Sequence, residues 1–563
     1  MNGLLIKSGF VYDPLNNIDG EKMDIAVHGG KIVDRLENAK VIDASGMVVM
    51  PGGVDLHSHI AGAKVNTGRL LRPEDHYKDV ESKTALTRSG VGYSIPSTFT
   101  TGYRYSRMGW TTVMDPAMPP LKAKHTHEEL NDTPMVDKGS YPLLGSNWFV
   151  LEYLRAKEYE ECAAYVAWMM NATKGYAIKI VNPGGLEAWG FGRNVRNIDD
   201  PVPNFDITPR EIVHGLCKVN RLLNLPHTIH VHTNNLGKPG NYLTTLETMK
   251  CVEDLATDGK PVIHLTHCQF SSFAGEDWRT LKSASEEIAK YVNSHSHVTI
   301  DIGQIIFTNT TTMTADGPFQ FILYQLTGNK WVNNDVETET SSGIVPFSYK
   351  RKSYVHATQW TIGLELALQI KDPWRVLVTT DHPNAGPFTA YPKIIAWLMS
   401  QKARDTVMKK ISKRARRKAL LPAVDREYTL YEIAIATRAG QAKALGLKSK
   451  GHLGVGADAD IAIYDLNPDK MNLAKHPMAI RRAFKNAAYT IKDGEVVVKN
   501  GEIVKSVPGK TYWVNVKASP SLMEIEPELQ KIFEDYYTVK YENYSVPEHH
   551  LAVATPVPVQ AKV

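Results

Sequence analysis

Two histidines close together follow an apolar, strand-like run. His57 and His59 come directly after the segment 47–56, separated from each other by one serine. In an extended chain, side chains two residues apart point to the same face, so both imidazoles can face one metal ion. Core or surface histidines are the alternative interpretation. The spacing favours metal-dependent chemistry at the end of this strand.

A lysine lies inside a second apolar run. Lys179 is flanked by Ile178 and Ile180 in the segment 176–182, which is typical of a buried strand. Burying an ammonium group without a partner costs several kcal/mol, so an ordinary lysine is unexpected here. Lys174 lies nearby but precedes the run, which makes it the poorer candidate for a site residue. A plain edge residue is the alternative for Lys179.

Three more strand-like runs end with polar side chains. His230 and His232 share one face of their run, whereas His264 lies three residues before His267 and should point away from it, into the core. Asp381 places a carboxylate directly after another apolar run. Together these residues offer the nitrogen and oxygen ligands that divalent transition metals use.

The elements that position these residues alternate between apolar strands and helical stretches. This alternation predicts parallel βαβ units and an α/β fold. Eight parallel strands close a TIM-type (β/α)8 barrel, whose chemistry lies at the C-terminal strand ends. The candidate strands are 47–56, 111–114, 141–144, 176–181, 227–231, 262–266, 298–302 and 375–380.

Both ends of the chain are rich in short strands and turns. We expect them to pair into one small β-sandwich beside the barrel; two unrelated hairpins are the alternative. The predicted domains are the first part of the sandwich at 1–50, the barrel at 51–425, a helix with the second part of the sandwich at 426–510, and a C-terminal arm at 511–563.

Three segments lie outside this scheme. Residues 309–353 are polar and poorly periodic, which predicts an insertion near the mouth of the barrel. The basic run 402–418 is either a solvated helix face or a landing site for an acidic substrate tail or a partner protein. The arm at 511–563 has the composition of a segment that contacts a neighbouring subunit or stays mobile.

Composition excludes several classes of function. The net charge of +5 is small against 65 basic and 60 acidic residues, so no nucleic-acid partner is expected. The N-terminus does not resemble a signal peptide, and no run reaches the roughly 18 apolar residues of a membrane span. The four cysteines show no C-x-x-C spacing, so no iron–sulfur cluster is predicted. We expect a cytoplasmic protein.

The segment Pro51-Gly52-Gly53-Val54-Asp55-Leu56-His57-Ser58-His59 resembles the first metal-binding motif of the amidohydrolase superfamily, which includes hydantoinases and dihydroorotases. Segments 454–461 and 493–497 resemble the sandwich domain of that superfamily, so the resemblance spans residues 1 to about 505. It implies a pair of divalent ions, usually zinc, and N6-carboxylysine at Lys179. The implied metal ligands are His57, His59, Lys179, His232, His267 and Asp381.

Further segments resemble one family, the A subunit of formylmethanofuran dehydrogenase. They include 60–66, 118–129, 182–185, 311–318 and 383–389, so the resemblance is nearly full length. It implies condensation of formate with the amine of methanofuran, with Asp381 moving the proton. It also implies partner subunits that carry a molybdenum or tungsten pterin and iron–sulfur clusters.

Other interpretations stay open at this point. The chain also fits the A subunit of a bacterial formyltransferase/hydrolase complex, and a metal-free scaffold subunit belongs to a different class altogether. A free-standing hydantoinase is disfavoured by the family-specific segments. His230, Asn234 and Gln269 are candidate substrate contacts, with a supporting role for His230 as the alternative, and His382 has no assigned role.

Overall fold

The computed structural model describes residues 3–334, 342–517, 520–537 and 539–562. Its centre is an α/β fold with eight parallel strands, and each strand overlaps one of the eight predicted runs. The strands are β6 (Gly53–Asp55), β7 (Trp110–Met118), β8 (Asp137–Pro142), β9 (Lys179–Val181), β10 (Ile229–His232), β11 (Ile263–Leu265), β14 (Val298–Asp301) and β18 (Val376–Leu377).

These strands form two parallel sheets that meet at both edges. One contains β6, β7 and β8, and the other runs in the order β9, β10, β11, β14 and β18. Isolated parallel bridges join Leu143 to Lys179 and Ser58 to His382. The C-terminal ends of β6 and β18 therefore lie side by side, and the end of β8 adjoins β9.

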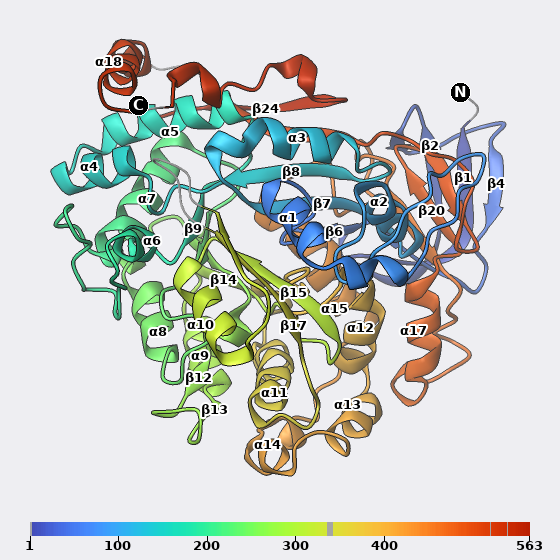
Figure 1. Cartoon of the computed structure of the whole chain (residues 1–563). Coiled ribbons are helices and arrows are strands. Elements are labelled where there is room, and N and C mark those ends of the chain that lie inside the picture. The colour runs from blue at the N-terminus through green and yellow to red at the C-terminus, as the bar shows by residue number, and fades with distance from the viewer. Residues whose placement is uncertain (1–2, 335–341, 518–519, 538, 563) are drawn as a thin grey trace.

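Helices follow the strands and cover the outside of the sheets (Figure 1). Helix α7 (Pro209–Leu223) illustrates how the sequence sets their ends, because Thr208 and Glu211 form a capping box around Pro209 in the first turn. The other helices of this region are α1 (Ala63–Leu71), α2 (Thr98–Arg107), α3 (Ala123–Asn131), α4 (Trp148–Ala156), α5 (Tyr159–Thr173), α6 (Gly185–Gly190), α8 (Tyr242–Lys250), α9 (Ser285–Ser294), α11 (Tyr354–Gln369) and α12 (Tyr391–Met399).

Both ends of the chain contribute to one nine-stranded sheet. The early strand β5 pairs antiparallel with the late strand β19, with Met50 opposite Ala462, so the two ends pair as predicted. The early strands are β1 (Leu4–Asp13), β2 (Ile18–His28), β3 (Lys31–Val33), β4 (Lys40–Asp43) and β5 (Val48–Pro51). The late strands are β19 (Ile461–Tyr464), β20 (Tyr489–Lys492), β21 (Glu495–Lys499) and β22 (Glu502–Ile503).

The predicted single strand 47–56 divides at Gly52 into β5 and β6. A Cβ atom at Gly52 would lie 2.2 Å from the hydroxyl oxygen of Thr111, so only glycine fits here. Its amide still donates to the carbonyl of Asp460, next to the pairs of β5 with β19, whereas the amide of Gly53 donates to the carbonyl of Gly109, just before β7. This break lets one segment serve both the terminal sheet and the parallel strands.

The predicted insertion has secondary structure of its own. Strands β15 (Asn309–Thr314), β16 (Val332–Asn334) and β17 (Ser342–Ser348) form an antiparallel sheet with α10 (Gly317–Thr327) beside it. Part of the predicted insertion, 335–341, lies outside the described residues.

The C-terminal arm lies on the chain's own body. Strand β23 (Thr511–Lys517) pairs with the start of β8 and with β24 (Ala554–Gln560), both in parallel. Helix α18 (Pro520–Tyr536) packs on α5, and Figure 1 shows this red segment along one side of the molecule. Contact with a second subunit stays a prediction.

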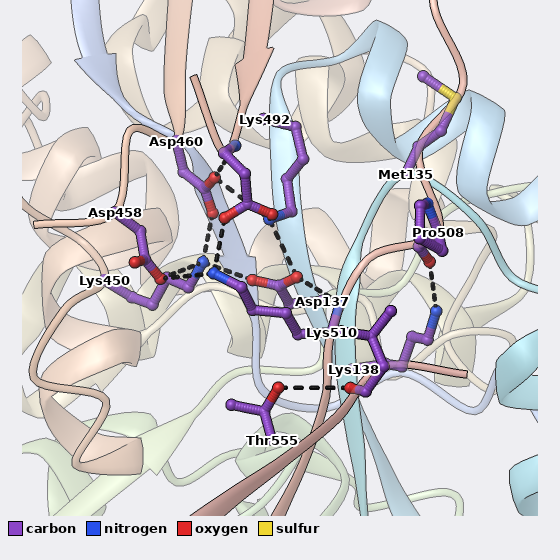
Figure 2. A network of polar contacts seen from close by, with 12 residues as sticks. Met135, Asp137, Lys138, Lys450, Asp458, Asp460, Lys492, Pro508, Lys510 and Thr555 are labelled. Carbon is purple, nitrogen blue, oxygen red and sulfur yellow. Dashed lines mark hydrogen bonds and ion pairs between the residues drawn. The ribbon is translucent and has the colours of Figure 1, made fainter. Parts of the chain in front are cut away.

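A buried network of opposite charges joins three parts of the chain (Figure 2). Asp137, the first residue of β8, lies 3.0 Å from the ammonium nitrogen of Lys492 in β20. It also contacts Lys450 and accepts a hydrogen bond from the backbone amide of Lys510, just before β23. Lys450 contacts Asp460 at 2.6 Å. The parallel strands, the terminal sheet and the arm are thereby held together.

Two short helices after α12 carry the basic run. Its lysines and arginines on α13 (Gln401–Met408) and α14 (Lys413–Lys418) are mostly exposed, which agrees with the solvated-face interpretation. None of the helices that the structure describes is both long and apolar enough to cross a membrane.

Candidate metal centre

The predicted ligands follow or end the parallel strands, with one exception. His57 and His59 come after β6, His232 ends β10, and His267 and Asp381 follow β11 and β18. Lys179 is instead the first residue of β9, opposite His230 of β10. All of them are buried, with at most 4% of the residue exposed.

His57, His59 and Asp381 are brought together at one point. One carboxylate oxygen of Asp381 lies 3.0 Å from Nε2 of His57 and 3.5 Å from Nε2 of His59. Donors bound to one ion at about 2.0 to 2.1 Å are separated by roughly these distances. The three side chains also form one of the groups whose ligand atoms all lie within 4.8 Å of one another. They fit a single divalent ion.

The remaining predicted ligands adjoin this group. The ring of His267 lies 5.3 Å from that of His57 between centroids, and the ring of His232 lies 4.9 Å from that of His267. Nδ1 of His267 is a buried nitrogen without a hydrogen-bond partner among the described residues. An orphaned, buried imidazole nitrogen is costly unless it binds something. This favours a second ion beside the first.

Lys179 also has a buried nitrogen atom without a hydrogen-bond partner within the described ranges. Its ammonium nitrogen is buried and has no hydrogen-bond partner in the part of the chain that the structure covers. Burial lowers the pKa of Lys179 to about 7, against the opposing influence of Asp301 and Asp381. A substantial fraction of this amine is therefore neutral near pH 7, and a neutral amine is the form that reacts with CO2.

The backbone is strained at two of the predicted ligands. His267 and Asp381 both adopt positive φ angles, 38° and 43°, which non-glycine residues rarely do. Gly303 lies between them, and a Cβ atom there would be 2.4 Å from Cβ of His267. Such strain concentrates at functional sites, and here it turns two polar side chains toward the same space.

Two buried carboxylates favour positive charge at His57. Burial is the largest influence on His57 and lowers its pKa, as does Lys179, but Asp381 and Asp301 together raise the pKa above its ordinary value. Asp301, the last residue of β14, lies fully buried with a carboxylate oxygen 3.6 Å from Nδ1 of His57. Sequence reasoning missed Asp301, although its position at a strand end gave the same signal as Asp381.

Two further polar residues were missed and hold predicted ligands in place. Asp316, at the N-terminus of α10, contacts Nε2 of His232 at 3.1 Å. Asn384 donates its side-chain amide to the carboxylate of Asp381 at 2.9 Å. Both lie in segments that are typical of the family, but nothing in their own spacing marked them as neighbours of the ligands.

Two of the predicted substrate contacts are engaged elsewhere. The side-chain amide of Gln269 donates to the carbonyl of Gly303 and accepts from the backbone amide of Ile305. Asn234 donates to Asn182 and to the carbonyl of Pro183, which holds two loops together. The side-chain oxygen of Asn234 has no hydrogen-bond partner among the described residues, and a role of either residue as a substrate contact stays a prediction.

Three more histidines surround the centre. Both ring nitrogens of His230 are hydrogen-bonded, to His57 and to His227, which supports the alternative of a supporting role. His264 is fully buried and contacts the carboxylate of Asp301 at 3.2 Å. The Nδ1 atom of His382 accepts a hydrogen bond from the backbone amide of Phe388.

Comparison with protein families gives one match that covers most of the chain. The model of the amidohydrolase family matches residues 40–498. This range includes every predicted ligand.

Two curated proteins are similar over nearly the whole length. Protein FwdA of Methanocaldococcus jannaschii is 57% identical over 557 residues, which cover 97% of each chain. The A subunit of the formyltransferase/hydrolase complex Fhc of Methylorubrum extorquens is 35% identical over 557 residues, which cover 96% of each chain.

A solved structure is similar over the full chain. The crystal structure of the formyltransferase/hydrolase complex (FhcABCD) from Methylorubrum extorquens in complex with methylofuran contains a chain with 34% identity and a TM-score of 0.90, and the match covers 100% of both chains.

Proposed function

Because the chain belongs to the amidohydrolase family and, within it, to the family formed by the A subunits of formylmethanofuran dehydrogenase, we propose that it makes and breaks the C–N bond of formylmethanofuran. In the forward direction it condenses formate with the primary amine of methanofuran, and in reverse it hydrolyses the formamide. The observation that carries this proposal is the convergence of His57, His59 and Asp381 at hydrogen-bonding distances beside orphaned nitrogens of Lys179 and His267.

The residues present fit a centre of two divalent ions, for which the family resemblance implies zinc. His57, His59 and Asp381 would hold the first ion, and His232 and His267 the second. Lys179 would carry a carbamate, formed when its neutral amine attacks CO2 and releases a proton, and the resulting anion would bridge the two ions. Replacing an ammonium by an anion suits a buried site that holds divalent cations.

The eight parallel strands would form one barrel, with the terminal sheet as a β-sandwich beside it.

When bound, the ions supply Lewis acidity that polarises the carbonyl group and stabilises developing negative charge. The chain's own contribution is proton transfer and orientation. Asp381 would accept a proton from the amine as the C–N bond forms and deliver it to the formate oxygen that leaves when the C–O bond breaks. Asn384 holds the carboxylate of Asp381 in place through a hydrogen bond of 2.9 Å. Burial of the whole group excludes bulk water.

Metal analysis of the purified protein tests this proposal. We expect two divalent ions per chain, a carbamate on Lys179 in a crystal structure, and formate release from formylmethanofuran that is lost after chelation and restored by zinc. A chain that purifies without stoichiometric metal and with a bare Lys179 would instead be a scaffold subunit.

The structural match with a chain of a formyltransferase/hydrolase complex supports a second candidate, the hydrolytic direction only. The identity of the partner subunits distinguishes the two candidate functions. We propose that the chain assembles with subunits that carry a molybdenum or tungsten pterin and iron–sulfur clusters, and the higher identity with Protein FwdA favours this assignment. Co-purification of a formyltransferase without any redox subunit would favour the second candidate.

A further inference from the structure

Three buried imidazoles form a chain that leads away from the candidate metal centre. Nδ1 of His57 lies 2.9 Å from Nε2 of His230, and Nδ1 of His230 lies 3.0 Å from Nε2 of His227. The chain ends where Nδ1 of His227 lies 2.7 Å from the carbonyl oxygen of Ala444, in α16 (Gly440–Leu445). All three rings are at most 1% exposed.

The carbonyl oxygen at the end of this chain fixes the direction of every hydrogen bond in it. A carbonyl only accepts, so Nδ1 of His227 carries a hydrogen and its Nε2 is an acceptor. Nδ1 of His230 must then donate, which leaves its own Nε2 as an acceptor. By the same step Nδ1 of His57 donates, so in the neutral ring that binds a metal ion Nε2 is the nitrogen without a hydrogen.

This assignment requires neutral rings and no competing acceptor. Neither His227 nor His230 forms an ion pair with a carboxylate in the described residues, and the ring of His264 stacks on His230 at 4.8 Å between centroids. A charge on these packed, buried rings would be costly. The carboxylate of Asp301 lies 3.6 Å from Nδ1 of His57, beyond hydrogen-bond range, and contacts His264 instead.

The geometry also decides which nitrogen of His57 faces a metal. His57, His230 and Asp301 form a second group that could hold an ion. However, the separation of 2.9 Å between His57 and His230 is that of a hydrogen bond, and both nitrogens of His230 are occupied. The Nε2 side of His57, which faces Asp381 at 3.0 Å, is the side that is free to bind.

We propose that His227 and His230 are positioning residues that lock the tautomer of His57, so that an unprotonated Nε2 faces the first metal ion. The carbonyl oxygen of Ala444 sets the tautomer of His227 and, through the hydrogen bonds between the rings, those of His230 and His57. The inference rests on the proposed metal centre, and it goes further by assigning a role to two histidines outside the proposed set of metal ligands. Partners of this kind typically change metal affinity by about 10- to 100-fold.

Two substitutions at His227 test the proposal, measured as the two metal dissociation constants by chelator competition. His227→Phe keeps the ring volume but removes both hydrogen bonds, and we expect about 10- to 100-fold weaker binding of one ion, with the other ion within about 3-fold. His227→Gln retains a donor for Ala444 and an acceptor for His230, and we expect it to bind both ions nearly as the wild type does.

His127→Phe is the matched control, because His127 is equally buried and also bonds to a backbone carbonyl, that of Thr173, but lies outside the chain of imidazoles. It should lower the stability of the fold without changing either metal affinity. Unchanged affinities in His227→Phe, or a loss in His227→Gln equal to that in His227→Phe, would overturn the proposal.

A crystal structure of the metal-loaded wild type gives a second test that does not depend on how the variants fold. We expect an ion on Nε2 of His57 and a hydrogen bond between Nδ1 of His57 and His230. An ion on Nδ1 of His57 overturns the inference but leaves a metal centre in place. A wild-type chain that binds no metal at all would instead contradict the proposed function.

Discussion

The pKa of Lys179 is set by its buried surroundings. It is 2% exposed, is fixed opposite His230 by the pairing of β9 with β10, and has a pKa lowered to about 7 by burial. An ordinary surface lysine is protonated at neutral pH and cannot attack CO2. Burial in a strand therefore leaves part of this amine neutral near pH 7, which is the form that the proposed carbamate requires.

Replacing Lys179 by methionine should remove the carbamate while keeping the shape of the side chain. We expect metal affinity to fall by about 100-fold or more, with a parallel loss of formate release. The measurements are metal content after dialysis against a weak chelator and the rate of formate release. Lys174→Met is the control, because Lys174 lies over the ring of Trp513 at 4.2 Å, away from the centre. Equal metal content in both variants would contradict a role for Lys179.

The candidate ligands were predicted from their positions at strand ends and from family motifs. Contacts between segments that are distant in the sequence could not be predicted in this way. His57, His59 and Asp381 stood at recognisable strand ends, and the structure places both imidazoles within 3.5 Å of the carboxylate. Asp316 belongs to an insertion without clear periodicity, so its approach to His232 could only be seen in three dimensions.

At the scale of elements, the insertion contributes to the centre through the first turn of α10. Asp316 caps this helix by accepting a hydrogen bond from the amide of Phe319 and also contacts Nε2 of His232 at 3.1 Å. A carboxylate in this position orients an imidazole and leaves its Nδ1 free for a metal. The insertion is therefore a support of the centre.

Asp316→Asn separates these two roles. Asparagine caps a helix as well as aspartate does, so the stability of α10 should change little. The new amide group would meet the hydrogen on Nε2 of His232, and we expect about 10-fold weaker binding of the second ion while binding of the first is retained. Chelator competition measures both. Equal weakening of the two ions would mean that Asp316 acts on the fold as a whole.

Helix α3 is joined to the end of α5 by a buried histidine that should make the protein sensitive to acid. Burial lowers the pKa of His127 to about 4, whereas the unfolded chain titrates near 6.5. The unfolded state binds more protons between these values, so stability is lost as pH falls from about 6.5 to 4. By pH 5 the loss should be about 2 kcal/mol.

Urea denaturation at pH 7.5 and pH 5 measures this difference. His127→Gln keeps an N–H donor for the carbonyl of Thr173 but does not titrate, so the variant should lose about 2 kcal/mol less than the wild type between the two pH values. An identical pH dependence in both proteins would show that His127 is already charged in the folded state.

Apolar runs located the parallel strands except for most of β8, because buried parallel strands are usually apolar on both faces. The predicted run 141–144 covers only the end of β8 (Asp137–Pro142), whose first four residues are Asp, Lys, Gly and Ser. The division of the run 47–56 was not predicted, because the sequence does not show what surrounds Gly52. Only the close approach of Thr111 to Gly52 shows why the chain turns there.

At the scale of the whole molecule, buried charges connect parts of the chain that are far apart in the sequence. Asp137, Lys450 and Lys492 are each at most 2% exposed and connect the parallel strands with the terminal sheet. Buried charges are stable only while they are paired. Removing one partner therefore affects three parts of the chain at once.

Asp137→Asn should destabilise the protein by about 3 to 5 kcal/mol, because it removes one of the two carboxylates that the buried ammonium groups of Lys450 and Lys492 share. Urea denaturation at pH 7.5 provides the measurement. Asp469→Asn is the control, since Asp469 pairs with Lys22 at 3.0 Å on the surface and should matter by less than about 1 kcal/mol. Similar losses in the two variants would show that the network contributes no more than a surface pair.

The pairing of β5 with β19 has a consequence for how the chain is made. Met50 has no partner strand on this side until Ala462 has left the ribosome, because β19 is synthesised roughly four hundred residues later. During translation, the segment that carries His57 and His59 is therefore anchored on one side only. Nascent chains of this protein should expose an apolar strand edge for much of their synthesis, which is the kind of surface that chaperones bind.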